Sequence, residues 1–96
     1  MESSEPIPLG MKQIQEQLEK LNGWEIEEGR LVKEFNFQDF KTAGEFVNKV
    51  SQLAEEQKHH PDIFWWYNKI KLQLFTHRIN SLTMDDFILA EKINKI

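Results

Sequence analysis

The chain has 96 residues, of which 40% are hydrophobic and 29% charged, a composition typical of one soluble domain and not of a disordered chain. Its formal net charge is -4 and it has no cysteine, which argues against nucleic-acid binding, disulfide bridges, thiol nucleophiles and cysteine-based zinc sites. No stretch reaches the roughly 20 apolar residues that cross a bilayer and no signal peptide is visible, so we expect a cytoplasmic protein without membrane partners.

The chain begins with a predicted flexible tail, residues 1–8, followed by one predicted domain, residues 9–96. Early in that domain, apolar residues recur at steps of three and four, which is typical of an amphipathic helix. These residues are Met11, Ile14, Leu18 and Leu21. We expect Gly23 to end the helix, because glycine readily takes the left-handed conformation of a helix cap.

A β-hairpin is predicted next. Trp24 and Ile26 share one face of a short strand, and Glu28-Gly29 is its turn. The returning strand alternates between two sets of side chains, and the more apolar set should face the core. That set is Leu31, Lys33, Phe35 and Phe37.

The longest predicted helix follows, with Asp39 as its N-cap. Its apolar residues form one continuous face: Phe40, Ala43, Phe46, Val47, Val50, Leu53 and Ala54. Pro61 should end this helix, because the residue before a proline is pushed out of helical geometry. We therefore expect His59 and His60 at the C-terminus of the helix or just past it.

A second hairpin is predicted over residues 64–67 and 70–75, with a tight turn at Asn68-Lys69. Its first strand should point Trp65 and Trp66 to opposite faces of the sheet. Its second strand leads directly to His77.

A last helix is predicted from Thr83, where Thr83 and Asp86 have the spacing of a capping box. Its apolar side consists of Phe87, Ala90 and Ile93. The predicted order is αββαββα. We expect an α+β single domain in which helices cover one face of a four-stranded antiparallel sheet.

The three histidines are the candidate catalytic residues: His59, His60 and His77. Neutral imidazole gives and takes protons near pH 7 without a cofactor. Two carboxylates could orient them. Glu55 lies four residues before His59, which places both on one face if the helix reaches that far. Asp86 would cap the last helix or orient His77 or a substrate.

Structural readings of the same residues stay open. Histidines at a helix end also cap its carbonyls, and His77 could be an exposed loop residue. Three imidazoles plus water can ligate zinc, but neighbours such as His59 and His60 rarely bind one ion together, so no metal ligand is predicted. Candidate substrate contacts are Lys58, Thr76, Arg78 and, by stacking on a flat ring, Trp24.

The chain resembles the pterin-4a-carbinolamine dehydratase family over roughly residues 9–96. The motifs that carry the resemblance are Glu55-x-x-x-His59-His60-Pro61, Tyr67-Asn68, Thr76-His77 and Asp86, with weaker support from Gly23-Trp24, Glu28-Gly29 and Phe35-x-Phe37-x-x-Phe40. The family loop after Thr-His usually carries small residues and glycine. Here that loop contains Ile79 and Asn80, a departure that bears on substrate preference.

The resemblance implies loss of water from a 4a-hydroxytetrahydropterin, such as 4a-hydroxytetrahydrobiopterin, to give the quinonoid dihydropterin used in tetrahydrobiopterin recycling. It implies a homodimer or homotetramer and no cofactor. It also implies that His59 and His77 flank the reacting centre while His60 orients the pterin. Two other readings are a non-enzymatic oligomeric module that binds partner helices, and a metal-dependent hydrolase.

Overall fold

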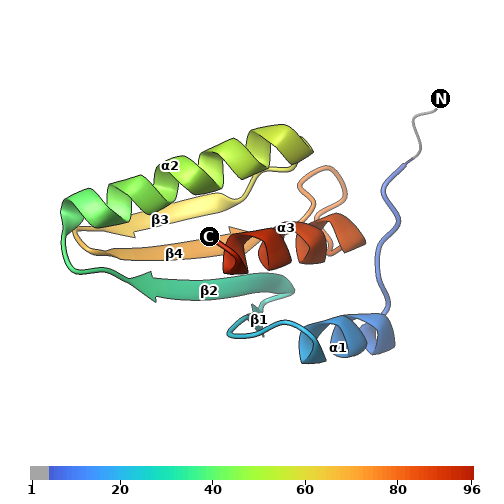
Figure 1. Cartoon of the computed structure of the whole chain (residues 1–96). Coiled ribbons are helices and arrows are strands. Elements are labelled where there is room, and N and C mark those ends of the chain that lie inside the picture. Colours follow the sequence, from blue (N-terminus) through green and yellow to red (C-terminus); the bar gives the residue numbers. More distant parts are fainter. Residues whose placement is uncertain (1–4) are drawn as a thin grey trace.

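A four-stranded antiparallel sheet with the strand order β1-β2-β4-β3 is combined with three helices (Figure 1). The computed structural model describes residues 5–96. Its elements are α1 (Met11–Glu19), β1 (Glu25–Glu27), β2 (Arg30–Asn36), α2 (Phe40–Gln57), β3 (Asp62–Trp66), β4 (Lys69–Leu74) and α3 (Met84–Asn94). The predicted α+β class and the order αββαββα are confirmed.

One face of the sheet forms the core together with the helices. Leu31 pairs with Leu74 across β2 and β4, and both side chains are fully buried. The helices contribute Ala43, Phe46 and Val50 from α2 and Phe87, Leu89, Ala90 and Ile93 from α3, with Ile14 and Leu18 of α1 packed against them. The predicted apolar faces are therefore confirmed, except that Met11 and Phe40 are 75% and 55% exposed.

The first hairpin closes through the predicted turn. Glu28 and Gly29 both have positive φ, 50° and 79°, which is the requirement of a two-residue turn whose twist matches that of the strands. Glu27 pairs with Arg30 on either side of this turn. The turn therefore places Arg30 at the start of β2.

Several predicted boundaries were wrong by one or a few residues. Helix α1 ends at Glu19 with Lys20 as its C-cap in right-handed geometry, because a last tight turn uses the carbonyl groups of Gln17 and Leu18. Gly23 does take a positive φ of 84°, but it lies beyond that cap.

The second hairpin turns at Tyr67-Asn68, one residue earlier than predicted, since Trp66 pairs with Lys69. Tyr67 takes the positive φ, 27°. Asn68 secures the turn by donating from Nδ2 to the Phe37 carbonyl at 3.0 Å. This pairing also starts β3 at Asp62, directly after Pro61.

Part of the predicted tail, residues 1–4, lies outside the described residues. Residues 5–10 form neither helix nor strand, and the Leu9 amide donates to the Leu82 carbonyl at 2.9 Å. From residue 5 onward, no helix combines the length and apolar character that a membrane span requires.

Candidate active site

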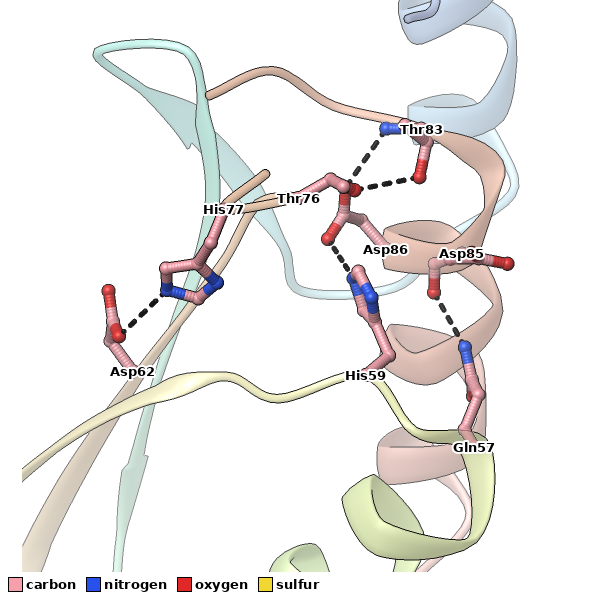
Figure 2. A network of polar contacts seen from close by, with 8 residues as sticks. All are labelled: Gln57, His59, Asp62, Thr76, His77, Thr83, Asp85 and Asp86. Carbon is pink, nitrogen blue, oxygen red and sulfur yellow. Dashed lines mark hydrogen bonds and ion pairs between the residues drawn. The ribbon is translucent and has the colours of Figure 1, made fainter. Parts of the chain in front are cut away.

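A buried carboxylate, that of Asp86, holds the imidazole of His59 (Figure 2). Nε2 of His59 lies 2.5 Å from Oδ1 of Asp86. The other oxygen, Oδ2, accepts hydrogen bonds from the Thr83 amide at 2.9 Å and from the Thr76 hydroxyl at 3.0 Å. Asp86 thus caps α3 as predicted, and it orients His59, not His77.

The end of α2 explains why His59 reaches Asp86. Lys58 is the C-cap in left-handed geometry, φ 58° and ψ 40°, and its amide donates to the carbonyl groups of Ala54 and Glu55. The helix therefore stops at Gln57, before Pro61 acts. The condition for a pairing of Glu55 with His59 on one helical face is not met, and the chain carries His59 toward α3 instead.

Glu55 pairs with His60. Nε2 of His60 lies 2.6 Å from Oε2 of Glu55, and both side chains are more than half exposed. The hydrogen bond and charge of His60, followed by the charge of Lys58, hold the pKa of the Glu55 carboxyl below its usual 4.5.

The environment of His59 favours its protonated form. The hydrogen bond to Asp86 is the largest cause and raises the pKa of His59 above 6.5. Burial opposes this shift, while the negative charges of Asp86 and Asp85 add to it. His59 therefore keeps a proton more readily than a free imidazole does.

His77 binds a carboxylate that sequence reasoning missed. Its Nε2 lies 3.2 Å from Oδ1 of Asp62, as Figure 2 shows. Asp62 begins β3 and pairs with Gln73 near the end of β4, so the strand register brings it beside the segment that carries His77. The signal available in the sequence was the position of an acid directly after Pro61.

The same register explains why His59 and His77 share one end of the sheet. His59 precedes β3 by only three residues, and His77 follows β4 by three. Because β3 and β4 are antiparallel and Asp62 lies opposite Gln73, these two segments meet at one edge. Gln57 ties α2 to α3 nearby, donating to the Asp85 carbonyl at 2.9 Å (Figure 2).

The predicted substrate contacts lie in different environments. Thr76 is buried within the Asp86 network, where its hydroxyl lies 2.8 Å from that of Thr83. Lys58 and Arg78 are exposed and pair with other acids: Nζ of Lys58 lies 3.8 Å from Glu55, and Nη2 of Arg78 lies 2.7 Å from Glu5.

Two aromatic residues are not brought to the histidines. Trp24 is only 4% exposed, and its Nε1 donates to Asn94 of α3 at 2.9 Å. Trp24 therefore packs in the core, where its ring contacts that of Phe35 edge to face with 6.3 Å between the centroids. Tyr67 lies in the turn after β3, at the opposite end of that strand from Asp62.

Each imidazole pairs through Nε2 with a different carboxylate. A carboxylate only accepts, so Nε2 must carry a proton in all three pairs, and Nδ1 is left for other partners. Within residues 5–96, no three His, Cys, Asp or Glu side chains are grouped to hold a metal ion. The geometry suits proton transfer by imidazoles.

Comparison with known proteins points to one family. Residues 7–96 match the family described as "Pterin 4 alpha carbinolamine dehydratase". A Nostoc punctiforme protein named "Putative pterin-4-alpha-carbinolamine dehydratase" is 48% identical over 84 residues, which cover 88% of this chain and 90% of that protein.

The chain is also similar to solved structures, including the following two. One, described as a transcriptional coactivator/pterin dehydratase from Brucella melitensis, has a TM-score of 0.88 and 33% identity, covering 93% of this chain and 97% of that chain. The other, described as a pterin dehydratase-like protein and a RuBisCO assembly factor in the alpha-carboxysome, has a TM-score of 0.65 and 18% identity, covering 77% and 88%. The second likeness concerns the fold alone.

Proposed function

The chain belongs to the pterin-4-alpha-carbinolamine dehydratase family, and we propose that it removes water from a 4a-hydroxytetrahydropterin, such as 4a-hydroxytetrahydrobiopterin. The product is the quinonoid dihydropterin, and the setting is tetrahydrobiopterin recycling. The observation that carries the proposal is the pair formed by His59 and the buried Asp86, because it provides an imidazole that holds a proton more readily than a free one does.

The reaction needs two proton transfers. The substrate carries a hydroxyl on C4a beside nitrogen N5, whose lone pair expels the hydroxyl when a proton reaches the departing oxygen. The N5 proton must leave for the C4a–N5 double bond to form. A proton donor and a proton acceptor on either side of this centre are therefore sufficient, each contributing about 10²–10⁴-fold in rate.

His59 is assigned as the acid. Its raised pKa favours the imidazolium, and with Nε2 bound to Asp86 the proton that it gives to the hydroxyl comes from Nδ1. His77 is assigned as the base that takes the N5 proton. After water leaves, His59 is neutral and His77 is charged, and exchange with solvent restores both.

His60 is assigned to binding and orientation of the pterin, because it is exposed and pairs with the exposed Glu55, whereas His59 pairs with the buried Asp86. Lys58 and Arg78 remain proposed polar contacts to the ring. Thr76 is proposed to act through Asp86, since its hydroxyl donates to that carboxylate.

The test is stopped-flow absorbance of freshly made 4a-hydroxytetrahydropterin with and without the protein. We expect strong acceleration over the spontaneous reaction, and a loss of about 10²-fold or more in kcat for His59→Ala and His77→Ala. His60→Ala is the matched control, because it removes a neighbouring imidazole that is assigned to binding, so KM should rise more than kcat falls. No acceleration by a folded oligomer would overturn the dehydratase assignment.

Self-association is also proposed, as a homodimer or homotetramer. Within residues 5–96, β3 is an edge strand, so one side of its backbone pairs with no strand of the described chain. Exposed aromatic residues cluster on and around it, and we name them the aromatic edge: Phe40, Phe64, Trp65, Trp66 and Tyr67. Pairing two such edges would cover this surface. We separately propose that the protein is located in the cytoplasm.

A second candidate function is a non-enzymatic interaction module. It is favoured by the 33% identical Brucella melitensis structure, which is described as both a coactivator and a dehydratase. If this function holds, binding of partner proteins persists in the His59→Ala, His77→Ala double variant. Loss of partner binding together with activity would contradict it.

A further inference from the structure

We propose that Asp62 and Phe75 are positioning residues for His77, an inference that rests on the proposed function. The carboxylate of Asp62 holds one edge of the imidazole, and the ring of Phe75 supports one face. Together they leave Nδ1 as the nitrogen that meets the substrate.

The edge contact comes from a rigid element. Nε2 of His77 lies 3.2 Å from Oδ1 of Asp62, and Asp62 is held in β3 by its pairing with Gln73 of β4. Because the carboxylate accepts, Nε2 carries the proton and the neutral ring is the Nε2–H tautomer. Among residues 5–96, no hydrogen bond from the protein reaches Nδ1 of His77.

The face contact is itself supported from a neighbouring strand. The rings of Phe75 and His77 have centroids 4.2 Å apart with an interplanar angle of 41°. Phe75 is only 8% exposed, and the guanidinium carbon of Arg30 lies 4.1 Å from its ring centroid. Arg30 also donates to Asn80 at 3.2 Å, so it holds both Phe75 and the loop that follows His77.

The backbone that carries His77 is closed into a short loop. The Thr76 amide donates to the Ser81 carbonyl at 2.9 Å, and Asn80 takes a left-handed φ of 52° that permits the return. With its backbone, one face and one edge held, the His77 side chain is still 51% exposed. The exposed remainder is available to the pterin.

The experiment uses ¹⁵N-histidine-labelled full-length protein, since imidazole ¹⁵N shifts report the tautomer. We expect one Nε2–H tautomer for neutral His77 in the wild type and a mixture in Asp62→Ala. We also expect kcat to fall about 10- to 100-fold in Asp62→Ala with KM within about twofold, because a misplaced base slows the chemical step. Asp62→Asn keeps an acceptor oxygen and should restore the single tautomer and part of kcat.

Glu27→Ala is the matched control, because it removes a carboxylate of the same sheet that binds Lys71 and no histidine. It should leave both readouts unchanged. Phe75→Leu keeps apolar volume but loses the flat ring, so kcat should fall about tenfold while the His77 tautomer stays single.

Unchanged ¹⁵N shifts and wild-type kcat in Asp62→Ala would overturn the role of Asp62, and wild-type kcat in Phe75→Leu that of Phe75. If the wild type itself does not accelerate dehydration, the proposed function fails. The spectra then still decide whether Asp62 holds His77 in one tautomer.

Discussion

The side chain of Asp86 both caps α3 and binds the imidazole of His59. Its Oδ2 closes the first turn of α3 by accepting from the Thr83 amide, while its Oδ1 binds His59. The hydrogen bond from Asp86 is the largest cause that raises the pKa of His59, and the charge of this fully buried carboxylate adds to it. The pKa of His59 is therefore the property through which a change at Asp86 can be observed.

We expect a bell-shaped pH profile of kcat/KM with an alkaline limb set by His59 and an acid limb where the base becomes protonated. The alkaline limb should lie above pH 6.5, because the pKa of His59 is raised. Asp86→Asn replaces the charged acceptor of that hydrogen bond by a neutral amide oxygen and removes the carboxylate charge, so the limb should move to lower pH. Stopped-flow rates between about pH 5 and 9, corrected for the spontaneous reaction, measure both limbs.

Asp85→Asn is the matched control for this profile. Asp85 raises the pKa of His59 only through its charge, as the smallest of the causes, so the limb should move in the same direction by less. An alkaline limb that is unmoved in Asp86→Asn, or a flat profile between about pH 5 and 8, would contradict proton transfer by His59.

The same pKa predicts how stability depends on pH. Since the pKa of His59 is raised in the folded state, the added stability is fully present below about pH 6.5 and is lost as pH rises through the folded pKa. The free energy of unfolding of the wild type should exceed that of His59→Gln more at about pH 6 than at about pH 9. Urea unfolding at both pH values measures this difference, and a difference that grows with pH would refute it.

At the scale of elements, the end of α2 decides where the histidines lie. Lys58 takes the left-handed conformation that a glycine usually supplies at this position. This conformation ends the helix at Gln57. The chain direction then changes, so that His59 contacts Asp86 of α3 and His60 contacts Glu55. A longer helix would place Glu55 and His59 on one face instead.

Lys58→Gly should raise the free energy of unfolding by about 0.5–1 kcal/mol, because glycine takes positive φ without the steric cost of a Cβ. The exposed pair with Glu55 that it removes is worth little. Lys49→Gly, in the middle of α2, is the matched control and should lower stability by about 1 kcal/mol. Urea denaturation compares the two variants. Equal destabilisation by both would contradict strain at Lys58.

The same Lys58→Gly variant also tests the proposed contact of Lys58 with the pterin, which a rise in KM would support.

At the scale of the whole molecule, apolar surface is concentrated on the aromatic edge. Trp65 stacks on Phe40 of α2 with 4.7 Å between the ring centroids, and Trp66 stacks on Phe64 with 6.4 Å between the ring centroids. As predicted, the two tryptophans lie on opposite faces of β3. Both faces of this edge strand therefore present aromatic side chains, next to backbone groups that no other strand of residues 5–96 pairs with.

Trp66→Lys should convert the proposed dimer or tetramer to smaller species, because a charged side chain on an edge strand opposes pairing with a second copy. Light scattering coupled to size-exclusion chromatography measures the mass. Met11→Lys, at an equally apolar and 75% exposed residue of α1, is the control and should keep the wild-type mass. If Trp66→Lys keeps the molecular mass of the wild-type oligomer, the subunits do not associate through the aromatic edge.

Local chemistry made most of the fold predictable. Asp39 accepts from the Thr42 amide at 2.8 Å as an N-cap, and Glu28-Gly29 forms the expected turn. The spacing of Thr83 and Asp86 correctly predicted a capping box. These signals work because caps and tight turns depend on neighbours within three or four residues. The motif of histidines and acids likewise indicates the family from the sequence alone.

The pairing of acids with imidazoles was decided by the tertiary structure. Sequence spacing suggested Glu55 as the partner of His59 and, as an alternative to its capping role, Asp86 as the partner of His77. In the structure, Asp86 binds His59 across 27 positions and Asp62 binds His77 across 15. Such contacts depend on where α2 ends and on how β3 registers with β4. A one-residue change in a helix end or a strand register redirects every side chain that follows, so periodicity alone does not specify these partners.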